Sequence, residues 1–122
     1  VKIYGFVQEM PDFMRASDIL VSKAGPGTIS EAFIAGLPVI LYSRLPGQED
    51  GNVGYVVDNF AGVWAPRPDA VVTAMRYWLD HPDQRRKAMD ACLRLARPQA
   101  AREIAHLLAA QVGVSVSSEP VI

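Results

Sequence analysis

The stretch KAGPGTISEAFIAGLPVIL, residues 23–41, holds a glycine-rich turn, the start of a helix and an apolar strand. A short apolar run at residues 19–22 precedes it, so the local order is strand, turn, helix and strand. This is the order of a parallel β–α–β unit, whose crossover is right-handed. The stretch therefore predicts an α/β domain built on a parallel sheet.

The same alternation extends over the first half of the chain. Candidate strands lie at residues 2–5, 19–22, 38–42 and 62–65, and helix-compatible segments at 11–16, 29–35 and 52–59. After Ala65 the pattern is helical, with a first helix from near Pro68 that stops at His81-Pro82, a second helix after it and a third that opens at Pro98. We expect a Rossmann-like, three-layer α/β domain with a parallel sheet of about four strands over residues 1–113, and a disordered tail over 114–122.

Bulk composition narrows the class of protein. The 122 residues suit one domain, and 12 Lys and Arg against 13 Asp and Glu argue against a nucleic-acid partner. The single cysteine, Cys92, excludes an internal disulfide. No apolar run is long enough to span a membrane, so we expect a cytoplasmic protein with peripheral membrane contact at most. The chain opens in a strand-like pattern without Met, which suggests a piece of a longer protein.

The glycine-rich turn is suited to an anion. In open parallel sheets, ligands bind beyond the carboxyl ends of the strands, where helix N-termini present free amides. Gly25 and Gly27 allow close approach of a ligand, whereas Pro26 has no amide hydrogen. The expected donors are the amides of Gly27, Thr28 and Ile29. The spacing of the glycines matches neither the dinucleotide-binding pattern G-x-G-x-x-G nor the P-loop pattern G-x-x-x-x-G-K-[ST].

Thr28 and Glu31 admit two interpretations. The Thr-x-x-Glu spacing fits a capping box, in which each side chain caps a backbone amide of the first helical turn. The Glu31 carboxylate could instead accept two hydrogen bonds from a vicinal diol such as that of ribose. Both interpretations stay open on spacing alone.

A second polar cluster, LPGQEDGN at residues 45–52, follows the strand at 38–42 on the same sheet edge. Gln48, Glu49, Asp50 and Asn52 offer the amide donors and carboxylate acceptors that a polyhydroxylated ring requires. The alternative is an ordinary polar loop with turns and a helix cap.

Five blocks of sequence, in order and without large gaps, resemble the monogalactosyldiacylglycerol synthases. They are GFVQEM at 5–10, KAGPGTISEA at 23–32, AGLPVIL at 35–41, PGQEDGN at 46–52 and YVVDNFAGVW at 55–64. These enzymes are GT-B glycosyltransferases and share a family with the peptidoglycan N-acetylglucosaminyltransferase. The resemblance implies two Rossmann-like domains that face a cleft, and this chain is similar to the later part of the C-terminal, UDP-sugar-binding domain.

The resemblance implies a donor-binding role for each matching position, with no cofactor and no metal. The general base and the acceptor site are expected in the N-terminal domain, so no catalytic residue is assigned. The implied contacts are Val7, which follows Phe6, with uracil, Gly27 and Thr28 with the diphosphate, Glu31 with ribose, and Gln48, Glu49 and Asn52 with the sugar. Phe6, Gly25, Pro26 and Ile29 are expected to complete the donor-binding site.

The activity implied is transfer of a hexose from UDP-galactose or UDP-glucose to diacylglycerol in glycolipid synthesis. This chain alone is expected to bind the donor without turning it over. The alternatives are a UDP-N-acetylglucosamine-dependent transferase, a UDP-sugar epimerase, or a non-catalytic α/β regulatory module whose Gly-Pro-Gly turn is only a tight connection.

Overall fold

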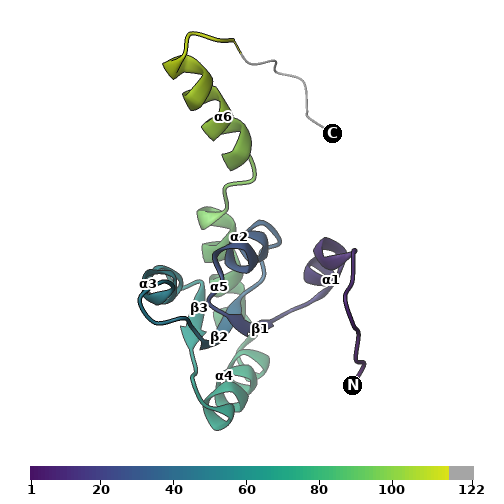
Figure 1. Cartoon of the computed structure of the whole chain (residues 1–122). Helices are drawn as coiled ribbons and strands as arrows, with labels where there is room; N and C mark the ends of the chain where they lie inside the picture. Colours follow the sequence, from purple (N-terminus) through teal and green to yellow (C-terminus); the bar gives the residue numbers. More distant parts are fainter. Residues whose placement is uncertain (116–122) are drawn as a thin grey trace.

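A computed structural model describes residues 1–115 of the chain, and Figure 1 shows its elements. Helices and strands alternate up to β3, and helices follow from there. In chain order the elements are α1 (Met10–Ala16), β1 (Leu20–Lys23), α2 (Pro26–Ile34), β2 (Val39–Ser43), α3 (Asp50–Asp58), β3 (Gly62–Trp64), α4 (Pro68–Asp80), α5 (Pro82–Leu95) and α6 (Ala100–Gln111).

The three strands form a parallel sheet in the order β1-β2-β3. The central strand begins Val39-Ile40-Leu41, and all three side chains are fully buried. A parallel strand covered on both faces has this continuous apolar character. The predicted α/β class and parallel sheet are confirmed.

Helices cover both faces of the sheet, as the three-layer prediction requires (Figure 1). One core cluster joins Phe33 of α2, Val56 of α3 and Cys92 of α5 to the sheet. The other joins Ile40 of β2 to Trp78 of α4. The side chains of β2 therefore contact both layers and tie the helices to one framework.

The first predicted strand, at residues 2–5, is wrong. The segment is not a strand, and its large side chains are exposed, with Ile3 at 93% and Tyr4 at 56%. A strand needs a neighbour to pair its backbone N–H and C=O groups, and among residues 1–115 none lies beside this segment. Strand-forming side chains alone do not supply that neighbour.

The C-terminal helix α6 extends away from the sheet (Figure 1). Ile104, Leu107 and Leu108 are all more than half exposed on it. None of the helices among residues 1–115 is both long and apolar enough to cross a membrane. Residues 116–122 of the predicted tail lie outside the described part of the chain.

Cys92 belongs to the core. Its thiol lies 3.5 Å from the carbonyl oxygens of Leu37 and Ala61, to which it can donate. Burial raises the pKa of this thiol from 9.0 to about 12, because the thiolate would lose its hydration. A cysteine in this state packs as a small apolar side chain and is a poor nucleophile.

Gly62 is the position where the packing of β3 against β2 allows no side chain. A Cβ there would overlap the Val39 carbonyl oxygen and lie 2.7 Å from Cγ1 of Val56. We therefore expect Gly62→Ala to lower the free energy of unfolding by about 2–3 kcal/mol, as overpacking does, in urea denaturation. The matched control is Gly54→Ala in α3, where the nearest atom is 3.7 Å away and stability should hold or rise. Equal stability of Gly62→Ala and the native chain would contradict the packing described.

Candidate functional site

The carboxyl ends of the three parallel strands lie on one edge of the sheet, and α2, α3 and α4 each begin there. A helix N-terminus carries unpaired amides and a partial positive charge. Both polar stretches identified in the sequence, at residues 25–31 and 45–52, lie at this edge. The edge is therefore the candidate site.

The β1–α2 turn is tighter than the sequence predicts. Gly25 caps α2 and Pro26 is its first residue, so the helix starts three residues before the predicted position at Ile29. The Ile29 amide donates to the Gly25 carbonyl at 3.1 Å. Ile29 was therefore wrongly predicted as a free donor. Among the described residues, the amides of Gly27 and Thr28 have no partner and remain for a ligand.

Of the two interpretations of Thr28 and Glu31, the capping box is the one that the structure excludes. No side chain caps α2, and Glu31 lies beyond the first turn. Proline is favoured at the first helical position because its fixed φ suits the helix and it has no amide hydrogen to leave unpaired. This preference at Pro26 shifts the helix start, which frees the side chains of Thr28 and Glu31 from any capping role.

The N-terminus of α2 is open. A Cβ built on Gly25 or on Gly27 would have no atom within 4 Å, so there is room for a ligand atom beside each of these glycines. The two free amides and the helix dipole are thus accessible to an anion. Lys23, at the end of β1, is exposed and adds positive charge to the same edge.

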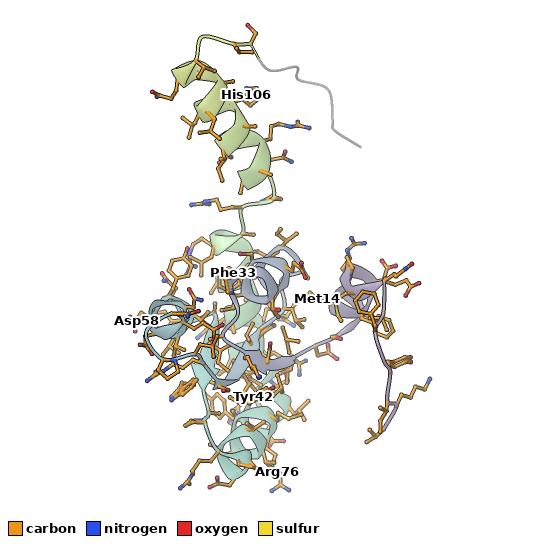
Figure 2. The ribbon with its side chains drawn as sticks, in the orientation of Figure 1. Met14, Phe33, Tyr42, Asp58, Arg76 and His106 are labelled. Carbon is orange, nitrogen blue, oxygen red and sulfur yellow. The ribbon has the colours of Figure 1, made fainter. Side chains whose placement is uncertain are left out.

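Glu31 lies in a groove between α1 and α2. The groove has a volume of about 210 Å³, and Pro11, Met14 and Arg15 of α1 line its other wall. Figure 2 shows Met14 on the side of α1 that faces α2, and Met14 is 5% exposed. The exposed Glu31 carboxylate has no hydrogen bond to another described residue, so both oxygens can accept from a ligand.

Phe6 and Val7 are not brought together with these residues. They lie in the irregular segment before α1, and neither lines the α1–α2 groove. Phe6 is almost fully exposed and Val7 partly so. Their assignment to a base-binding position stays a prediction.

The second polar stretch holds itself in place through its own side chains. The Leu45 amide donates to the Glu49 carboxylate at 2.8 Å, and the Gly47 amide donates to Asp50 at 2.8 Å. Asp50 also pairs with Arg44 at 2.7 Å. Among the described residues, the exposed Gln48 side chain makes no hydrogen bond. The amide oxygen and nitrogen of Gln48 thus both remain available to a ligand.

Asn52 links the two polar stretches. Its side-chain amide donates to the Ala24 carbonyl at 2.9 Å, across 28 residues of sequence. Asn52 also lines a groove of about 230 Å³ with Pro26, Tyr55 and Arg97. Sequence patterns did not single out Tyr55 or Arg97, since Arg97 lies at the distant link between α5 and α6 and only the fold brings it here.

The two histidines lie outside this candidate site. Nδ1 of His81 lies 2.8 Å from the Tyr77 carbonyl oxygen, to which it can donate, and the His81 ring stacks on the Tyr77 ring. His106 lies on α6, away from the sheet (Figure 2). Within residues 1–115, no three His, Cys, Asp or Glu side chains gather closely enough to hold a metal ion.

Comparison with known proteins agrees with this geometry. The family model described as "Glycosyltransferase family 28 C-terminal domain" matches residues 1–105. The chain belongs to this family. The family 28 domain is the C-terminal, Rossmann-like part of a GT-B glycosyltransferase, which confirms the fold that the resemblance implies.

The relatives of this family 28 domain include plant enzymes. A probable monogalactosyldiacylglycerol synthase 2 of Oryza sativa subsp. indica is 48% identical over 105 residues, which are 85% of this chain and 22% of the relative. Monogalactosyldiacylglycerol synthase 3 of Arabidopsis thaliana is 40% identical over 124 residues, 98% of this chain and 27% of the relative. The chain thus spans about a quarter of the length of these curated relatives, and the resemblance to this group is confirmed.

Glu31 gives a direct test of the family 28 site. We expect Glu31→Ala to weaken UDP binding by about 1–3 kcal/mol, because a ribose diol would lose a charged acceptor. Isothermal titration calorimetry measures the change. The matched control is Glu103→Ala on α6, an exposed glutamate outside the groove, which should bind UDP as the native chain does. An unchanged UDP affinity for Glu31→Ala would exclude the ribose contact.

Proposed function

We propose that this chain holds the UDP-sugar donor of a glycosyltransferase that moves a hexose to diacylglycerol. The observation that carries the proposal is the open N-terminus of α2, where two unpaired amides lie one helical turn from the unpaired Glu31 carboxylate. A nucleoside diphosphate has the matching groups, an anion and a ribose diol. The names of the relatives, monogalactosyldiacylglycerol synthases, support diacylglycerol as the acceptor and galactose as the sugar.

The turn is suited to stabilise a leaving group. In the proposed reaction an acceptor hydroxyl oxygen bonds to the anomeric carbon, its proton passes to a base, and the bond from that carbon to the diphosphate breaks. Negative charge then grows on the diphosphate oxygens. Amides of Gly27 and Thr28, fixed before the reaction, stabilise that charge without having to reorient.

The second polar stretch lies where the sugar would be. Leu45, Gly47, Glu49 and Asp50 use their polar groups to hold the loop, which leaves the Gln48 side chain free to donate to and accept from sugar hydroxyls. The base and the acceptor site are proposed in the part of the relatives' length that this chain does not span. We therefore expect this chain to bind the donor without turning it over, at the surface of the membrane that holds the lipid acceptor.

A substitution of Gln48 tests recognition of the sugar separately from recognition of the nucleotide. We expect Gln48→Ala to leave UDP affinity unchanged and to weaken UDP-galactose binding about fivefold, because one hydrogen bond to the sugar is lost. Calorimetric titrations with UDP, UDP-galactose and ATP provide the measurement, and Gln111→Ala on α6 is the matched control.

Two other outcomes of these titrations would count against the proposal. Equal losses of affinity for UDP and for UDP-galactose in Gln48→Ala would show that Gln48 does not contact the sugar. No binding of UDP or UDP-galactose to the native chain would contradict the donor-binding function itself and favour a non-catalytic module.

A further inference from the structure

The β1–α2 turn depends on hydrogen bonds at both of its carbonyl groups. The Gly25 carbonyl accepts from the Ile29 amide inside α2, and the Ala24 carbonyl accepts from the Asn52 side chain of α3. The first bond is part of the helix. The second comes from an element that lies 28 residues further along the chain.

The backbone just before the turn departs from regular sheet pairing. The register of β1 against β2 shifts between Ser22 and Lys23, so that Lys23 pairs with Ser43 and skips Tyr42. The Ala24 amide still donates to the Ser43 carbonyl at 2.9 Å, and Ala24 is fully buried. A bulge of this kind redirects the strand that follows it. The Ala24 carbonyl therefore points out of the sheet ladder, toward Asn52.

Asn52 is well placed to fix that direction. It is in the first turn of α3, where its own amide donates to the Glu49 carbonyl, and its side chain is partly buried. Within the described chain, its bond to Ala24 is the side-chain hydrogen bond that joins the start of α3 to the β1–α2 turn. One hydrogen of its Nδ2 group is thus already used to hold the turn.

We infer that Asn52 is a positioning residue for the diphosphate turn. By holding the Ala24 carbonyl, Asn52 sets the direction in which the chain enters α2, and with it the direction of the Gly27 and Thr28 amides. Amides act on an anion only when their direction is fixed within a narrow range, so loss of this bond loosens the part of the site that binds phosphate. This inference rests on the proposed donor-binding function.

The inference is tested by separating phosphate affinity from sugar affinity. We expect Asn52→Ala to lower the affinity for UDP and the affinity for UDP-galactose by the same factor, roughly tenfold. Both affinities are measured by calorimetric titration at a temperature where the chain is fully folded. Asn59→Ala is the matched control. Asn59 donates to the Tyr55 carbonyl at 2.8 Å at the other end of α3, so it loses the same kind of bond and should bind both ligands as the native chain does.

Each alternative role of Asn52 gives a different result. If Asn52 contacts the sugar directly, UDP affinity stays unchanged and UDP-galactose affinity falls, which overturns the inference. If Asn52 only stabilises the fold, the melting temperature falls while both affinities persist, which also overturns it. Should Asn52→Ala fail to fold, Asn52→Asp, which keeps the size of the side chain and removes the donor, is measured in the same way.

Titration of the native chain with UDP and UDP-galactose distinguishes failure of the inference from failure of the proposed function. If the native chain binds neither UDP nor UDP-galactose, the donor-binding function fails. If the native chain binds UDP and Asn52→Ala binds it equally well, the donor-binding function stands and the positioning role is excluded.

Discussion

The parallel pairing of β2 with both β1 and β3 is the constraint on which the site depends. Because the three strands run in the same direction, every connection returns through a helix, and three helices begin at one edge. The fully buried Val39, Ile40 and Leu41 hold that arrangement from both faces. Neither polar stretch could form the site alone, since the sheet sets the distance between them.

The polar groups at this edge fall into two sets. One set forms hydrogen bonds that hold the loops, and the other is available to bind a ligand. Glu49, Asp50 and Asn52 each accept or donate within the chain and so fix the two loops. The Gly27 and Thr28 amides and the side chains of Glu31 and Gln48 have no such partner among residues 1–115. A site whose loops are already held in place loses little conformational entropy when a ligand binds, which favours affinity. The resemblance implies ligand contacts for all of these residues except Asp50, whereas the hydrogen bonds separate them into two sets.

Much of the fold could be predicted from the sequence, because its signals are local. The apolar runs before and after the glycine-rich turn mark β1 and β2 and so frame α2, and Pro68 and Pro82 mark the start and the end of α4. The segment at 2–5 was mispredicted because a strand also needs a neighbour, which no local pattern reports. The start of α2 was misplaced because two local signals competed, and Pro26 prevailed over the Thr-x-x-Glu pattern.

The site was less predictable for a different reason. Residue types at 45–52 identify polar groups, but the partners that occupy them are backbone carbonyls and amides placed by folding, such as Ala24 for Asn52. Ile29 was counted as a free donor because its bond to Gly25 depends on where the helix begins. Tyr55 and Arg97 reach the groove beside Pro26 only through the packing of α2, α3 and α5.

The central claim is that the Gly27 and Thr28 amides bind the phosphates of a nucleotide. The most direct measurement is a two-dimensional amide NMR titration of the isotopically labelled chain with UDP. The account predicts that the Gly27 and Thr28 resonances move most, and that Gly54, inside α3, stays in place. Saturable binding of UDP that leaves both turn amides unmoved and shifts another group of residues would contradict it.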